Sequence, residues 1–428
     1  MGVALLLRRA RQIGYDLGQF AQISKSLAVE LMFHGFIWLL IAAIPSPPID
    51  TLVVSPIAFR SELEPWVQYR QQQGHVLQVV SPQRTARELH DAVRAAARNG
   101  HLKSVVLFGD VDLVPTAYAP AKVNILWGSE PTIATDQLYA DVDGDDIPEL
   151  AVGRIPVDTP QQLQAVVRKI VQYETSVDKG SDRHQIDVVA GVGGFGIVAD
   201  SLIEASARSV FTQVVPKNYS VRRLPADPEA TCKQISAGSF AWIYLGHGLP
   251  TMLDVAPTPR GPRPILDVRG VSNLQCGANS PLAVLIACYT GAIDSRADSL
   301  AEELVLEEHG PVAAIAATRV TMPYGNSVLG CELLRAAFRE APGNLGDVWL
   351  RAQQQTLAAT PTDDSLRRSL DSVARGVSPP PADLAAERRE HVLLYQLLGD
   401  PLLRLQYPAS DPQPTARMAA GPSDRQTR

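Results

Sequence analysis

The amino-acid sequence predicts an α/β protein built around mostly parallel strands. Short apolar runs rich in β-branched residues, such as residues 104–108 and 282–286, show no polar alternation, which is typical of strands buried on both faces. Single segments with helical spacing separate these runs, at residues 59–73, 85–98 and 159–174. Strands that alternate with single helices pair in parallel through right-handed crossovers. At 428 residues, the chain is long enough for two such units side by side.

The first unit is expected over residues 50–180. Its strands are predicted by the apolar runs 51–54, 75–80, 104–108 and 151–156. The helix that follows begins with Thr159 and Pro160, which suit the N-cap and the first helical position. The polar stretch Lys179–His184 then breaks the pattern, so we place the boundary between two subdomains there.

The second unit is expected over residues 181–407. We predict its strands at residues 186–190, 242–245, 282–287 and 312–317, and its helices at 299–308, 328–340, 345–358 and 384–397. The polar, proline-containing stretch 361–381 is expected to be a loop excursion. Residues 408–428 have the composition of a disordered tail.

Composition and charge exclude some functions. The net charge of −6 is spread along the chain without a basic stripe, which argues against nucleic-acid binding. Four cysteines lie far apart with no C-x-x-C pair, so neither a zinc site nor a disulfide framework is expected.

The first 49 residues read as an addition to the fold. Basic residues precede an apolar run at 35–44, and prolines follow it. The run is shorter than the ~20 residues of an untilted membrane span, but it fits the apolar region of an export signal. The alternative is an amphipathic helix over residues 31–44 that packs on the domain or associates with a membrane. We therefore expect an exported or cell-envelope protein, and a cytoplasmic location stays open.

An acidic loop is the candidate metal site. Asp141, Asp143 and Asp145 alternate around Gly144, as in the first half of a calcium-binding loop, because hard oxygen ligands suit a hard cation. The glycine comes two residues too early for an EF-hand. The alternatives are structural Ca²⁺ and a solvated acidic turn, and no cofactor is expected to take part in the chemistry.

A glycine-rich stretch offers a competing function. Residues 191–196 match G-x-G-x-x-G between a predicted strand and a predicted helix, which is the context of a dinucleotide-binding turn. However, no acidic residue ends a following strand about 20 residues on, where a ribose would be bound. A lone glycine pattern is weak evidence for this function.

Two predicted strands lead to reactive side chains. The run 242–245 is followed by His247 between two glycines, and the run 282–287 is followed by Cys288. The carboxyl ends of neighbouring parallel strands lie at one edge of a sheet, so these residues can meet there as base and nucleophile. Gly248 would leave its N–H free to point at an oxyanion. Each signal by itself has another interpretation: the cysteine can be a small buried apolar side chain, and the G-H-G sequence can be a turn.

Several of these motifs occur together, in order, in a known family. The chain resembles the gingipain-type cysteine peptidases of the caspase-like clan over residues 50–407, through Leu107-Phe-Gly-Asp110, Val114-Pro115, Asp141-x-Asp-Gly-Asp, Ala151-Val-Gly-Arg-Ile-Pro156, Tyr244-Leu-Gly-His247-Gly, Ala287-Cys288-x-x-Gly291 and Leu398-Gly-Asp-Pro401. The resemblance implies a caspase-like α/β/α sandwich in two side-by-side subdomains. It also implies endopeptidase activity on polypeptides by a His247–Cys288 dyad, with an oxyanion hole from the N–H groups of Gly248 and Cys288. Members are typically exported, and several bind calcium.

The resemblance also marks differences. Gingipains specific for arginine or lysine carry acidic residues in the segment matching residues 193–204, and one acid just before it supports the histidine. Val192 stands at that place here, so the sequence does not identify a third residue that would orient His247. Asp200 and Glu204 are candidates for a pocket that takes a basic side chain, or else lie on an exposed first helical turn. Tyr324 falls where the family places an aromatic wall for the P1 side chain.

Two functions from different classes therefore remain. One is a cysteine endopeptidase, supported by the intact histidine and cysteine. The other is a catalytically silent relative that binds peptides or serves as a scaffold, favoured by the missing acid beside His247.

Overall fold

The computed structural model describes residues 48–176, 181–193, 197–340, 343–377 and 383–407. The description below concerns the unit that begins at Ile49. The expected targeting segment and the expected tail lie almost wholly outside the described residues. Among the described helices, none is long and apolar enough to cross a membrane.

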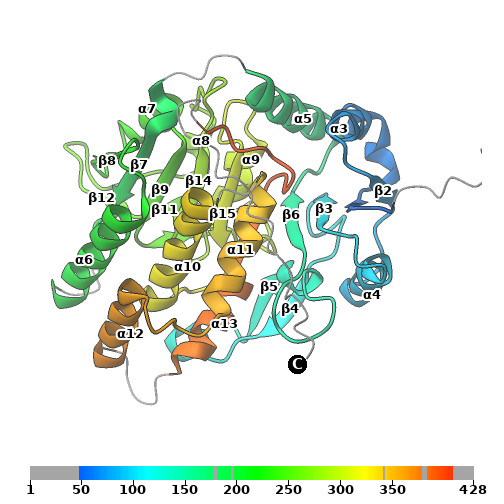
Figure 1. Cartoon of the computed structure of the whole chain (residues 1–428). Coiled ribbons are helices and arrows are strands. Elements are labelled where there is room, and N and C mark those ends of the chain that lie inside the picture. Colours follow the sequence, from blue (N-terminus) through cyan, green and yellow to red (C-terminus); the bar gives the residue numbers. More distant parts are fainter. Residues whose placement is uncertain (1–47, 177–180, 194–196, 341–342, 378–382, 408–428) are drawn as a thin grey trace, which may run out of the picture. The chain divides into compact units, whose positions relative to one another are not determined.

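One mixed sheet of ten strands forms the centre of this unit (Figure 1). Neighbouring strands pair in parallel, except that the last strand of the chain runs antiparallel to one neighbour. The strands, in spatial order, are β2 (Leu77–Val80), β1 (Thr51–Val54), β3 (Ser104–Phe108), β6 (Ala151–Ile155), β16 (Tyr395–Leu398), β15 (Ala313–Ala317), β14 (Leu282–Ile286), β9 (Ala241–Leu245), β7 (Gln185–Ala190) and β8 (Ser220–Leu224). The expected mostly parallel α/β fold is confirmed. Strands from the two expected units lie in one continuous sheet, and β16 joins them.

Helices cover both faces of the sheet. They are α3 (Arg60–Gln72), α4 (Ala86–Ala97), α5 (Pro160–Thr175), α6 (Ile197–Val214), α7 (Thr231–Ser236), α8 (Val268–Val271), α9 (Leu300–Leu306), α10 (Pro323–Arg335), α11 (Leu345–Leu357), α12 (Ser365–Val377) and α13 (Leu384–Leu394). Because successive strand residues point to opposite faces, β9 sends Ile243 into the core that contains α10 and α11, and Trp242 into the core that contains α9. In Figure 1, α10 and α11 lie in front of β14 and β15.

The helix expected to begin at Thr159 and Pro160 is confirmed. Thr159 accepts a hydrogen bond from the Gln162 N–H in a capping box, and α5 starts at Pro160 as expected.

Some expectations were wrong or incomplete. The stretch 361–381 contains α12, whose Leu366 and Leu370 are buried. The helix expected at 384–397 ends at Leu394, because Tyr395–Leu398 pairs with β15 as a strand. Neither β8 nor the antiparallel hairpin of β4 (Ala117–Pro120) and β5 (Thr132–Thr135) was predicted.

Candidate active site

The two reactive side chains follow neighbouring strands in matched register. Leu245 at the end of β9 lies opposite Ile286 at the end of β14. His247 and Cys288 each stand two residues beyond this pair. The two segments are in contact, because a Cβ atom on Gly248 would lie 2.6 Å from the Cys288 carbonyl oxygen. The sheet thus brings the histidine and cysteine segments together, and only glycine fits at position 248.

The sulfur of Cys288 faces the segment that follows β15. The Thr321 N–H donates a hydrogen bond to Cys288 Sγ over 3.3 Å, and Thr321 Oγ1 lies 3.7 Å from the same sulfur. Thr321 is itself held, since its hydroxyl accepts from Asn326 Nδ2 at 2.9 Å and Asn326 Oδ1 accepts from the Tyr395 hydroxyl at 2.7 Å. The same sulfur lies 3.8 Å from the Thr321 carbonyl oxygen, to which the thiol can donate. These contacts orient Cys288 Sγ.

A sharp turn follows Cys288. Tyr289 has φ 60°, a left-handed conformation that costs a bulky residue about 1–3 kcal/mol. Its hydroxyl donates to Glu130 Oε2 at 3.0 Å, and burial together with this carboxylate raises the Tyr289 pKa to about 12. Gly291 completes the turn, because a Cβ there would lie 2.8 Å from the Ala316 side chain. The strain and the close approach fix the position of the cysteine.

Hydrogen bonds with Tyr244 and Asp254 hold the backbone of His247. The Tyr244 hydroxyl lies 3.0 Å from both the His247 carbonyl oxygen and Asp254 Oδ2, and the His247 N–H donates to Asp254 Oδ2 at 3.2 Å. Burial, followed by the Asp254 charge, raises the Tyr244 pKa above its usual value. These bonds fix the main chain on both sides of the imidazole.

The start of the glycine-rich stretch packs against this carboxylate. The Val192 N–H donates to Asp254 Oδ2 at 3.1 Å, and a Cβ on Gly191 would lie 2.1 Å from the same oxygen. A Cβ on Gly246 would lie 2.5 Å from the Tyr244 hydroxyl oxygen. Close packing around Asp254 therefore explains Gly191 and Gly246 without a nucleotide. Residues 194–196 of the stretch are outside the described ranges.

Asp254 was not singled out from the sequence. It lies in the proline- and arginine-rich segment 250–264 between the two strands. Two short antiparallel pairs form in and beside this segment, β10 (Gly248–Leu249) with β11 (Met252–Leu253) and β12 (Val255–Ala256) with β13 (Arg263–Pro264). An aspartate seven residues after the histidine was visible, but nothing local showed that this segment folds back.

Tyr324, the expected aromatic wall, lies in the first turn of α10 and is only 7% exposed. Its hydroxyl donates to Asp371 Oδ1 at 2.7 Å and accepts from Arg388 at 2.7 Å. Its ring packs in a small cluster with α12 and α13 residues. The tyrosine therefore joins three helices in this structure.

The two acidic candidates for a basic-side-chain pocket lie on α6. Glu204 is exposed, and its carboxylate pairs with Arg208 at 2.7 Å and with Arg223 at 3.3 Å. The hydrogen bond from Arg208 is the main reason that the Glu204 pKa is lowered. Asp200 falls in the first turn of the same helix, where the structure describes no side chains.

A cavity of about 440 Å³ lies between α6, α10 and the sheet. It extends to Gly246, which precedes His247, and to Asn326, which bonds the threonine beside Cys288. Its described lining is mainly apolar, with Val188, Phe211, Ile243, Val284 and Leu334 among its members. That lining also includes the charged residues Glu204, Arg208 and Arg223, and both arginines pair with the Glu204 carboxylate.

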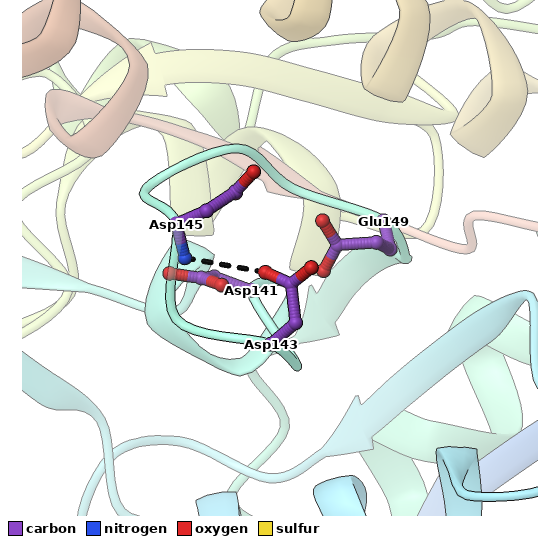
Figure 2. Close-up of side chains that lie close together, drawn as sticks. All are labelled: Asp141, Asp143, Asp145 and Glu149. Atoms are coloured by element: carbon purple, nitrogen blue, oxygen red, sulfur yellow. Dashed lines mark hydrogen bonds between the residues drawn. The ribbon is translucent and has the colours of Figure 1, made fainter.

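The acidic loop brings four carboxylates together (Figure 2). One ligand oxygen from each of Asp141, Asp143, Asp145 and Glu149 lies within 4.8 Å of the others, and Asp143 and Glu149 point toward each other. Burial raises the Glu149 pKa, and the three aspartates add to the shift. Four hard oxygen donors that repel one another fit a bound Ca²⁺. Glu149 is the fourth member of this cluster, in addition to the three aspartates predicted from the sequence.

Comparisons with known proteins identify the family and the fold. The model of Peptidase family C25 matches residues 44–406. Lys-gingipain W83 from Porphyromonas gingivalis is 26% identical over 155 residues, which are 34% of this chain and 8% of that protein. Lys-gingipain from strain ATCC 33277 of the same organism is 25% identical over 136 residues, 30% of this chain and 7% of that protein. The match therefore spans less than a tenth of these relatives' length.

Solved structures share the fold. The Arg-specific cysteine proteinase gingipain R superposes with a TM-score of 0.63 and 17% identity, over 85% of this chain and 79% of that one. A second protease structure gives a TM-score of 0.65 at 17% identity, over 86% and 83% of the two chains. The expected gingipain-like α/β fold is confirmed. Because the family model spans most of the sequence, this chain belongs to Peptidase family C25, the gingipain-type cysteine peptidases.

Proposed function

We propose that this protein is a cysteine endopeptidase in which Cys288 is the nucleophile and His247 the general acid and base. The observation that carries the proposal is the parallel register of β9 and β14, which sets both residues at one sheet edge with their segments in contact. The Thr321 N–H at Cys288 Sγ supports the assignment.

The chemistry follows from these positions. His247 takes the proton of the Cys288 thiol, Cys288 Sγ attacks the scissile carbonyl carbon, and the carbonyl π electrons move to its oxygen. The N–H groups of Gly248 and Cys288 are the proposed donors to this oxyanion, each of a kind worth ~3 kcal/mol in related chemistry. His247 then protonates the leaving amine and later takes a proton from the water that hydrolyses the thioester.

The cavity beside the candidate active site supports a preference for one class of side chain in the substrate residue that precedes the scissile bond. Its described walls are apolar, and Glu204 is already paired with two arginines. A lysine or arginine side chain would find no unpaired carboxylate among these described walls, whereas an apolar side chain would lose water-exposed area. We propose that apolar residues are preferred there.

We also propose that the loop Asp141–Glu149 binds Ca²⁺ as a structural ion. The four converging carboxylates support this, and the hydrogen bond from His90 Nε2 to the Asp141 carbonyl, 2.8 Å long, links the loop to α4. A cation would relieve the repulsion among the carboxylates and so stabilise the loop.

The test is to profile the purified protein against a peptide library and to compare Cys288→Ala with Cys232→Ser. We expect cleavage by the wild type and by the Cys232 variant, and at least ~10³-fold less by the Cys288 variant. A folded wild type that cleaves none of the peptides, or a Cys288 variant that retains activity, would contradict the proposal. The first result would leave a silent peptide-binding protein.

Alkylation gives an independent readout. Burial raises the pKa of Cys232, and raises the pKa of Cys276 and Cys331 to about 12. Iodoacetamide at neutral pH should therefore label Cys288 first, as mass spectrometry of the digested protein would show.

A further inference from the structure

The connection between β4 and β5 presents three consecutive apolar side chains. Within it, η3 (Asn124–Trp127) leaves Ile125 40%, Leu126 79% and Trp127 50% exposed. We call these three residues the apolar tip. Consecutive exposed apolar residues are unfavourable in a soluble protein unless they have a binding role.

The apolar tip is held in place by buried polar contacts. The Glu390 carboxylate accepts hydrogen bonds from the backbone N–H groups of Lys122, Val123 at 2.7 Å and Asn124 at 2.9 Å. Asn124 is fully buried, and Gly128 ends the turn at φ 86°, which glycine adopts without strain. The exposed side chains are therefore displayed by an ordered turn.

Two hydrogen bonds connect this turn to the cysteine. Asn124 Nδ2 donates to the carbonyl oxygen of Val320, which precedes the residue whose N–H reaches Cys288 Sγ. On the other side, Glu130 accepts from the hydroxyl of Tyr289, the residue after Cys288. The apolar tip therefore lies between two contacts with the immediate surroundings of the nucleophile.

The hairpin itself is anchored to the same edge of the sheet. Arg319, just after β15, donates through Nε to the Thr132 carbonyl oxygen on β5 at 2.9 Å. Its other nitrogens form two bonds with the Asp294 carboxylate, at 2.8 and 2.5 Å. This bidentate pair fixes β5, and with it the turn, relative to the active site. In Figure 1 the hairpin lies beside α13.

We propose that the apolar tip binds apolar side chains of the polypeptide substrate at a distance from the scissile bond. The proposal rests on the endopeptidase function above. Its support is the continuity between the tip and the residues flanking Cys288. The tip is too small for a stable dimer, which needs about 800 Å² from each partner. The cations beside it, Lys122 and Arg319, are matched by the carboxylates of Glu130 and Asp294, so an anionic lipid surface gains nothing there.

The test compares a long and a short substrate. The double variant Leu126→Ser/Trp127→Ser is measured with fluorescein-labelled casein and with the best tripeptidyl coumarin amide from the profiling. Ile57→Ser is the matched control, because Ile57 is 76% exposed and lies in η2 (Ile57–Phe59), in another part of the chain. We expect kcat/KM for casein to fall about tenfold, which corresponds to ~1.4 kcal/mol, and the tripeptide rate and the control to stay unchanged.

The same variants in a Cys288→Ala background give a readout that does not need catalysis. Fluorescence anisotropy with labelled casein should show about tenfold weaker binding for the double variant only. If the wild type cleaves neither substrate, the endopeptidase function fails and this measurement alone decides the role of the tip. The proposal would be overturned by equal losses on both substrates, by no loss on either, or by unchanged anisotropy. A faster tripeptide rate in the double variant would also overturn it, because it would mean that another segment of this chain covers the tip.

Discussion

The Tyr244 hydroxyl lies 3.0 Å from Asp254 Oδ2, and through this pair the core of the sheet holds the loop that carries His247. Tyr244 is fully buried on β9, whereas Asp254 lies in the segment after the histidine. The same carboxylate oxygen accepts from the N–H groups of Val192 and His247. One acid therefore connects β9, the start of the glycine-rich stretch and the loop that carries His247.

Removing this acid should reduce turnover more than substrate binding. Asp254→Ala removes the acceptor of the Val192 and His247 N–H groups and leaves the Tyr244 hydroxyl only the His247 carbonyl oxygen, so the His247 backbone is held less firmly. We expect kcat to fall about 10- to 100-fold with KM nearly unchanged, and the free energy of unfolding to fall by ~2 kcal/mol. Steady-state kinetics and urea unfolding measure both.

Asp383→Ala is the matched control for the Asp254 variant. Asp383 also accepts from two backbone N–H groups, those of Ala385 and Ala386, at the start of α13. Its loss should cost ~1 kcal/mol of stability and leave kcat unchanged. A normal kcat in Asp254→Ala would show that Asp254 supports only the fold.

A methyl group at Gly191 should have a similar effect by a different route. A Cβ there would lie 2.1 Å from Asp254 Oδ2, so Gly191→Ala must push the carboxylate away from the histidine loop. We expect ~2 kcal/mol less stability and at least tenfold lower kcat/KM. Gly277→Ala is the control, because its Cβ would meet nothing within 4 Å, and we expect a change within ~0.5 kcal/mol. Equal behaviour of the two variants would contradict this account.

The pattern of the sequence was sufficient for the sheet and for the approach of two strand ends. Apolar runs without alternation identified β9 and β14, and the parallel arrangement follows from the helices between strands. The role of Asp254 could not be predicted from these patterns, because its contacts form only when the segment after His247 folds back toward Gly191, which is distant in sequence. Residues 395–397 were expected at the end of a helix, because a short apolar run has no decisive period, and pairing with β15 makes them part of a strand instead.

Calcium should stabilise the protein through the loop Asp141–Glu149. At a free Ca²⁺ concentration 100 times Kd, one site adds ~2.7 kcal/mol, which should raise Tm by about 5 °C, and chelation should reverse the rise. Asp143→Asn should remove most of this response, because Asp143 lies in the carboxylate cluster. Asp146→Asn is the control: Asp146 is not one of the four, and asparagine tolerates its φ of 67°. A Ca²⁺ response that survives in Asp143→Asn would place the ion elsewhere.

Glu302 should make the protein less stable as the pH rises. It lies in the first turn of α9 and is 2% exposed, and burial raises its pKa from 4.5 to about 8, with the Asp110 and Asp298 charges adding to the shift. Between these two values the folded chain binds a proton that the unfolded chain releases. The free energy of unfolding therefore falls with rising pH over this window.

Glu302→Gln tests this dependence, because glutamine resembles the protonated acid and its oxygen can still accept from the Ser299 N–H, as Glu302 Oε2 does at 2.8 Å. At pH 8.5 the variant should be more stable than the wild type, on the order of 2 kcal/mol, and near pH 4.5 the two should agree. Urea unfolding at both pH values measures the difference. A variant that is less stable than the wild type at pH 8.5 would contradict this account, because the folded site would then favour the ionised Glu302 through contacts that glutamine cannot replace.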